Sequence, residues 1–174
     1  MGGQKKTGIE GGNLQHSPLA DTSEDKKSFV VLSLADETFA VEIEDVCEII
    51  RVPKITWVPG SPQVVRGVIN LRGNIVAVLD LAVMLALPSA IESSQSRIVI
   101  VDSRGVKVGM LVDGVSQVKE IDPSKLEPSL PTLDKRQRLF VVAQSNVDDT
   151  LIGILDMEKI LEQADAASAA EQTI

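Results

Sequence analysis

Residues 29–50 read FVVLSLADETFAVEIEDVCEII. Two apolar runs of strand length, 29–35 and 39–43, flank the turn-forming sequence DET. A third segment, 44–52, alternates between its two faces, which is typical of a half-buried strand. This stretch therefore predicts three consecutive β-strands.

The chain after this stretch predicts two more strands and a short helix. A proline-rich loop at 53–62 leads to a second alternating segment at 64–73. The Gly-Asn pair at the end of that segment signals a two-residue hairpin turn, and residues 75–79 form the returning strand. Asp80 is a suitable N-cap for a helix with the sequence LAVMLAL, which Pro88 ends.

The second half of the sequence repeats this unit. With a shift of 69 residues, FVVL at 29–32 aligns with IVIV at 98–101. Further along the shift becomes 76 residues, so that IVAVLDL at 75–81 aligns with LIGILDM at 151–157. We expect the change of seven residues to fall at 122–138 or just after it.

The repeat predicts a mainly β fold. The 22 Val and 15 Ile residues favour strands. Five short antiparallel strands can close into a barrel that leaves few exposed edges, and a unit of about 60 residues is marginal as an independent domain. We therefore predict two five-stranded antiparallel β-barrels packed on each other, with a C-terminal helix from 157 to about 170 docked on them.

The predicted domain boundaries follow from the same pattern. Residues 1–27 are rich in Gly, Lys, Ser and Asp and are expected to form a disordered tail. The folded domain is expected at 28–163, with repeats at about 28–90 and 96–163 that are either intertwined or adjacent. Residues 164–174 are expected to hold the helix end and a C-terminal tail.

Composition argues against several functions. The net charge of −8 works against binding nucleic acid or an anionic membrane, and three Phe and one Trp are too few for a base-stacking surface. The single His, His16, and the single Cys, Cys47, provide no zinc cluster and little acid–base chemistry. We expect a cytoplasmic protein with no catalytic residues, no metal, no cofactor and no membrane span.

Two residue types that often carry chemistry are interpreted as structural. Cys47 is predicted to be a small buried core residue rather than a reactive thiol, because Ser116 replaces it in the other copy. The acidic pair Asp148–Asp149 is predicted to form a hairpin turn rather than a catalytic pair.

Features found in one copy only are the better candidates for function. Gln117 replaces Glu48 in the second copy, and RGVINLRGN at 66–74 has no counterpart there. Alternation places Glu48 and Arg72 on the outward faces of their strands. They form either a surface ion pair or the centre of an interaction surface, and spacing does not decide between the two. Each lies beside a valine that shares its face, Val46 or Val68.

The run GVINLRG at 67–73 carries the NLRG motif of the CheW family. The blocks VPGSPQVVRG, IVAVLDL and VGMLVDGVSQV occur around it in the order and spacing of that family. The chain resembles a CheW-type chemotaxis coupling protein from residue 29 to about 163.

The resemblance implies two SH3-like β-barrels and a non-enzymatic adaptor. CheW-like proteins connect the cytoplasmic tips of chemoreceptors to the histidine kinase CheA, whose regulatory domain has the same fold, and these contacts build higher-order arrays. The alternatives are an adaptor of a non-flagellar chemosensory pathway, such as pilus-based motility, and a small-molecule-binding β-barrel.

The resemblance also implies the residues that contact partners. It assigns the paired charges of the binding surface to Glu48 and Arg72, and receptor contact to the positions of Val46, Gly67 and Gly73. The full set of predicted partner-binding residues is Val46, Glu48, Arg66, Gly67, Val68, Asn70, Arg72 and Gly73.

Overall fold

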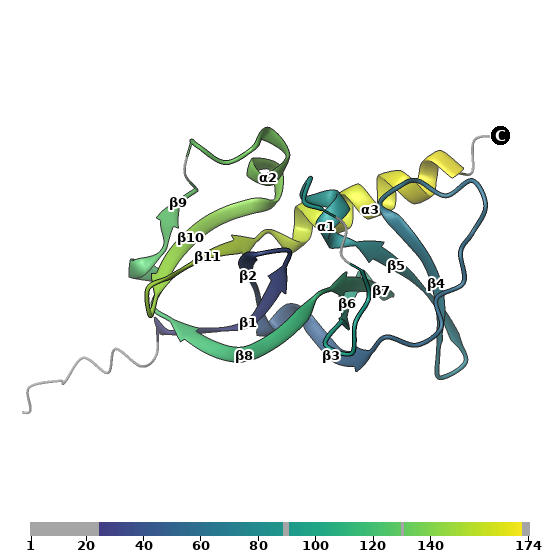
Figure 1. Ribbon diagram of the computed structural model, residues 1–174, viewed down its shortest axis with the longest axis horizontal. Helices are drawn as coiled ribbons and strands as arrows, with labels where there is room; N and C mark the ends of the chain where they lie inside the picture. Colours follow the sequence, from purple (N-terminus) through teal and green to yellow (C-terminus); the bar gives the residue numbers. More distant parts are fainter. Residues whose placement is uncertain (1–24, 89–90, 130, 172–174) are drawn as a thin grey trace, which may run out of the picture.

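The structure is a computed structural model that describes residues 25–88, 91–129 and 131–171. Two curled β-sheets lie beside each other, and the helix α3 (Met157–Glu171) runs from between them over one side of the molecule (Figure 1). Most of the predicted N-terminal tail, including His16, lies outside the described residues. Within the described residues, no helix is long and apolar enough to cross a membrane.

Sheet A has the strand order β8-β1-β2-β11-β10-β9, and sheet B has the order β3-β6-β7-β5-β4. The strands of sheet A are β1 (Lys27–Leu34), β2 (Glu37–Glu42), β8 (Gly114–Ile121), β9 (Glu127–Pro128), β10 (Val141–Val147) and β11 (Thr150–Leu155). The strands of sheet B are β3 (Val46–Arg51), β4 (Val65–Leu71), β5 (Asn74–Asp80), β6 (Arg97–Ser103) and β7 (Val106–Val112). The remaining elements are η2 (Ile43–Asp45), α1 (Leu81–Met84), η3 (Pro123–Lys125) and α2 (Lys135–Phe140).

Each sheet takes strands from both halves of the sequence. The first hairpin, β1–β2, lies in sheet A between β8 and β11, while β3, β4 and β5 join β6 and β7 in sheet B. The predicted antiparallel pairing therefore holds for all neighbouring strands except one pair in each sheet. The exceptions are the parallel pairs β2–β11 and β5–β7, where one half of the sequence meets the other.

The internal repeat is confirmed at the level of strand register. Ala77 of β5 pairs with Val108 of β7, and Gly153 of β11 pairs with Phe39 of β2. These two pairs are related by the same shifts of 76 and 69 residues that align the two halves of the sequence. The additional elements of the second copy, η3, β9 and α2, lie within 123–140, close to the predicted insertion.

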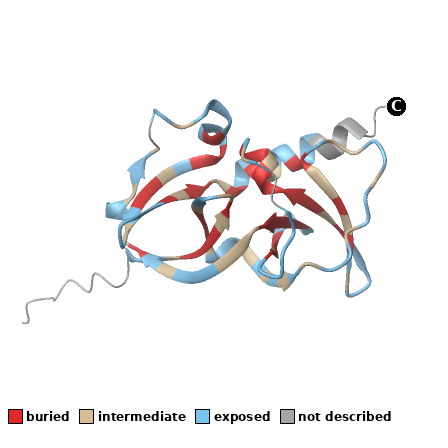
Figure 2. Cartoon of the chain, in the orientation of Figure 1, coloured by how far each residue is buried: buried red, intermediate tan, exposed pale blue. Residues whose placement is uncertain are grey.

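Apolar side chains form three clusters (Figure 2). One small cluster lies within sheet A around Phe29 and Ile154, and another lies within sheet B around Ile69 and Ile100. The largest cluster draws on both sheets and also includes Ile160 of α3. The two barrels therefore share a core, as the marginal size of each repeat predicts.

The turns differ from the sequence-based prediction by small steps. The β4–β5 turn is formed by Arg72 and Gly73 rather than by Gly73 and Asn74, because Leu71 pairs with Asn74. Asp80 caps α1 as predicted, with its carboxylate accepting a hydrogen bond from the Val83 amide at 3.1 Å. The helix ends before Pro88, because Ala86 has a φ of 55°. Asp148 and Asp149 form the predicted hairpin turn.

The prediction that Cys47 is buried is wrong, because its side chain is exposed. Val46 pairs with Val101 and Glu48 pairs with the adjacent Ile100, so that Cys47 is the extra residue of a β-bulge. The bulge shifts the alternation of β3 and turns Glu48, rather than Cys47, toward the half-buried face.

Gly67 allows sheet B to close. The segment after β3 reaches β4 through two backbone hydrogen bonds of 2.8 Å between Thr56 and Val68. A Cβ atom on Gly67 would overlap the carbonyl oxygen of Thr56 and lie 2.8 Å from Cγ2 of Ile55, and the φ of Gly67 is 149°. Only glycine fits this close approach without displacing the segment.

We predict that Gly67→Ala lowers the free energy of unfolding by about 3 kcal/mol, because overlap with Thr56 adds to backbone strain. The matched control is Gly105→Ala, since Gly105 has a φ of 86° and a Cβ atom added to it would meet no other atom within 4 Å. The control isolates the backbone contribution and is expected to cost about 1 kcal/mol. Urea denaturation measures both variants, and equal losses would contradict the steric argument.

Ser145 gives a prediction of the opposite sign. Its hydroxyl group is buried in β10 and has no hydrogen-bond partner among the described residues. Ser145→Ala removes this unsatisfied group, so we expect the free energy of unfolding to rise by about 1 kcal/mol. Exposed Ser116 provides the control, because Ser116→Ala should change stability by less than about 0.5 kcal/mol. A loss of stability in Ser145→Ala would contradict this prediction.

Candidate partner-binding surface

Glu48 and Arg72 form a bidentate ion pair between β3 and the β4–β5 turn. Both guanidinium Nη atoms of Arg72 donate to the carboxylate oxygens of Glu48, each at 2.7 Å. This geometry fixes the orientation of the guanidinium plane as well as its position. The pair joins the two edge strands of sheet B, so it also helps to close the barrel.

The turn that carries Arg72 is itself held in place. Arg72 and Gly73 have φ angles of 51° and 87°, which is typical of a tight two-residue hairpin turn. The side-chain oxygen of Asn70 accepts a hydrogen bond of 2.8 Å from the Gly73 amide. Arg72 therefore projects from a rigid turn rather than from a strand, which differs from the sequence-based expectation.

The two members of the pair differ in exposure. The side chain of Arg72 is 71% exposed, while that of Glu48 is 22% exposed. The hydrogen bonds and charge of Arg72 lower the pKa of Glu48 from its ordinary value. Glu48 is therefore an ionised anchor, and the outer side of the Arg72 guanidinium stays open to a partner.

The other predicted site residues divide into two groups. Asn70 and Gly73 belong to the turn beside Arg72, and Val46 and Val68 are half-buried on strands β3 and β4. Gly67 is buried against Thr56, so its geometry already has a structural explanation. Leu71 is half-buried and packs against the core of sheet B, as its face predicts.

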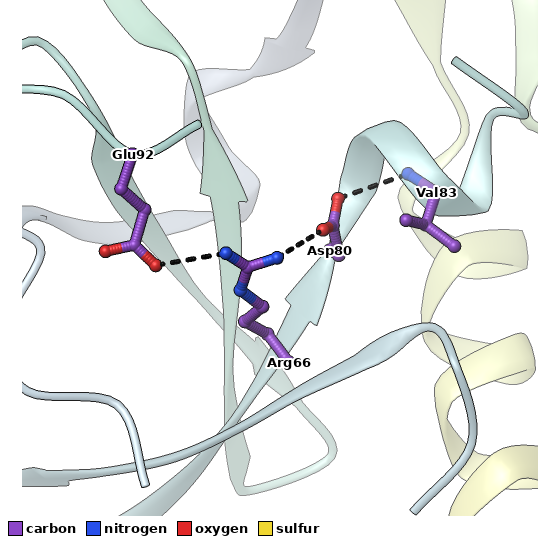
Figure 3. A network of polar contacts seen from close by, with 4 residues as sticks. All are labelled: Arg66, Asp80, Val83 and Glu92. Carbon is purple, nitrogen blue, oxygen red and sulfur yellow. Dashed lines mark hydrogen bonds and ion pairs between the residues drawn. The ribbon is translucent and has the colours of Figure 1, made fainter. Parts of the chain in front are cut away.

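Arg66 does not join the Glu48–Arg72 pair. Its guanidinium forms ion pairs of 3.4 Å with Asp80 at the start of α1 and with Glu92 in the following loop (Figure 3). Asp80 is buried and also accepts the hydrogen bond from Val83 that caps α1. Arg66 thus connects β4, α1 and the loop after α1.

A second ion pair occupies the equivalent place in sheet A, and sequence reasoning missed it. Nζ of Lys119 on β8 donates to Asp148 in the β10–β11 turn at 2.7 Å. The shift of 76 residues aligns Asp148 with Arg72. The two barrels therefore carry corresponding pairs with the charges exchanged, and in each pair the turn residue is the exposed one.

Trp57 was also missed as a candidate. Its side chain is 68% exposed and lines a groove of about 590 Å³ together with Ile55, Val65 and Arg66. An exposed Trp beside an Arg is a common feature of protein interfaces. Its position in a loop between prolines was the available signal.

The pKa of Glu48 gives a direct test of the pair in solution. Because Arg72 lowers that pKa, the carboxylate should stay ionised, and the pair should persist, until the pH falls through the lowered value. We predict that Arg72→Ala raises the pKa of Glu48 toward its ordinary value, as followed by carbon-detected NMR titration. The matched measurement is Asp148, whose pKa Lys119 lowers and which should not respond to Arg72→Ala. An unchanged Glu48 titration would show that the pair does not form.

Comparisons with known proteins agree with this architecture. The family model for the CheW-like domain matches residues 28–165. The crystal structure of the scaffolding protein TtCheW from Thermoanaerobacter tengcongensis is similar, with a TM-score of 0.70 and 36% identity over 82% of this chain and 88% of that one.

Curated relatives show the same likeness over most of their length. The chemotaxis protein CheW of Thermotoga maritima is 34% identical over 141 residues, which are 79% of this chain and 90% of the relative. The chemotaxis protein CheW of Bacillus subtilis is 28% identical over 143 residues, which are 82% of this chain and 92% of the relative. With the family model matching nearly the whole described chain, this protein belongs to the CheW-like family.

Proposed function

We propose that this protein is a non-enzymatic adaptor that couples transmembrane chemoreceptors to the histidine kinase CheA in chemotaxis. Membership of the CheW-like family is the observation that carries this proposal. The chemistry of the chain fits it, since the described residues include no group of three or more His, Cys, Asp or Glu side chains that could hold a metal ion. An adaptor needs binding surfaces held in a fixed relative geometry, and the shared core supplies that rigidity.

The proposed partners are the cytoplasmic tips of the receptors and the regulatory domain of the kinase. The Arg72 turn on sheet B is the surface proposed to contact a partner. Its guanidinium is oriented by Glu48 and is largely exposed, so binding requires little reordering of the side chain. Weak contacts of this kind gain strength when many copies assemble in an array.

Charge reversal at Arg72 tests this surface. We predict that Arg72→Glu reduces receptor-dependent activation of the kinase about tenfold or more, because a carboxylate replaces the exposed guanidinium. The assay mixes the purified protein, the kinase and a receptor signalling fragment and measures kinase autophosphorylation. Asp148→Lys is the matched control, since it reverses the exposed turn charge in the other barrel and should leave activation unchanged.

The double variant Glu48→Arg/Arg72→Glu separates the two roles of the pair. The exchange keeps opposite charges facing each other within the molecule but presents a carboxylate to a partner. If the partner contacts Arg72, the double variant stays inactive although its stability matches that of the wild type. Full recovery of activation would show that the pair serves only to close the barrel.

The same assay addresses the alternative pathway. Activation of a kinase from a non-flagellar chemosensory system, with no effect on the flagellar kinase, would assign the adaptor to that system. Failure to bind any kinase or receptor fragment would contradict the adaptor proposal.

A further inference from the structure

Sheet A carries an apolar groove with an acidic rim. The groove has a volume of about 470 Å³ and lies beside the parallel pair β2–β11. Its apolar lining includes Phe39, Leu133, Val141 and Leu151. Gly153 lies under the Phe39 ring, where a Cβ atom would be 3.0 Å from Cδ1. The groove is far from the Glu48–Arg72 pair, which lies at the free edge of sheet B.

The rim of this groove has one sign of charge. Asp36 and Glu37 stand at the β1–β2 turn, and Asp149 stands at the β10–β11 turn. Among the described residues that line the groove, none is Lys or Arg. The charge of the rim therefore favours a partner that carries Lys or Arg on both sides of an apolar stripe.

The repeat explains why no helix of this chain covers the groove. α3 follows β11, runs toward the sheet B side and places Ile160 and Ala164 in the shared core (Figure 1). α1 follows β5 at the equivalent point of the first copy but has only four residues, and Ala86 ends it with a φ of 55°. Sheet A therefore receives no helix that corresponds to α3.

The topology selects the form of the occupant. β2 lies between β1 and β11, and β11 lies between β2 and β10, so neither strand has a free edge to which a further strand could pair. A partner must dock through its side chains, as an amphipathic helix does in an apolar groove. A second copy of α3 is unsuited, because its acidic residues Glu158, Glu162 and Asp165 would face the acidic rim.

We propose that the β2–β11 groove is a docking site for a basic amphipathic helix of another protein. Leu151, which is 51% exposed at the rim, supplies the apolar contact at the open end. The carboxylates of Asp36, Glu37 and Asp149 receive the basic side chains at its two sides.

The test uses a synthetic peptide and the full-length protein. The peptide has the sequence of α3, Met157–Glu171, with Lys in place of Glu158, Glu162 and Asp165, so that an apolar stripe is flanked by positive charge. Binding is followed by amide chemical shifts. We expect shifts at Phe39, Leu151 and Gly153, no shift at Arg72, and much weaker binding of the peptide with the native acidic sequence.

The repeat provides matched variants for the same experiment. Leu151→Lys should weaken peptide binding at least tenfold, because it removes the apolar contact and adds a repelling charge. Ile75→Lys is the control, since Ile75 is the equivalent residue of sheet B and is also exposed. It should leave binding unchanged.

Four outcomes would overturn the proposal. They are no peptide binding, equal binding of the acidic peptide, shifts centred on the residues around α3, and equal effects of the two Lys variants. Concentration-dependent dimerisation that Leu151→Lys abolishes would also overturn it, because the groove would then hold a second copy. None of these results bears on kinase activation through Arg72, so the two proposals fail separately.

Discussion

The core between the two sheets is the constraint on which the rest of the structure depends. Each barrel encloses only a small cluster of its own, and the largest cluster takes side chains from both sheets and from α3. A unit of about 60 residues buries too little apolar surface to be stable alone. The exchange of strands between the two halves meets this requirement, because neither half can complete a sheet without the other. The surfaces of the two barrels are consequently held in one fixed relation.

The sequence predicted the parts of the fold that follow from local pattern. The repeat, the Asp80 cap, the Asp148–Asp149 turn and the C-terminal helix each depend on residues that are close in the chain. The parallel pairs β2–β11 and β5–β7 join strands from different halves, and periodicity contains no information about such a neighbour. Cys47 was misplaced for a related reason, because a single bulge residue reverses the faces of a strand without changing its composition.

The candidate site was predicted in its central pair but not in its geometry. Glu48 and Arg72 do meet, whereas Arg66 turns toward Asp80 and Glu92 although it lies in the same sequence motif. A motif states which residues occur together, and the backbone decides which of them share a surface. The Lys119–Asp148 pair shows the converse case, since the alignment of the two copies already placed Asp148 at the position of Arg72. Looking only for identity between the copies concealed a correspondence of position with opposite charge.

This exchange of charge has a consequence for a duplicated fold. Two identical barrels would present the same turn at both ends, and a partner that fits one turn would fit the other. Here the exposed residue of the turn is Arg72 on sheet B and Asp148 on sheet A, each held by an oppositely charged strand residue. An acidic group that is attracted to Arg72 is repelled at Asp148, so the same exchange that preserves barrel closure also distinguishes the ends. The ion pairs thus retain their structural role in both copies, while their polarity gives the molecule a direction along which different partners can be arranged.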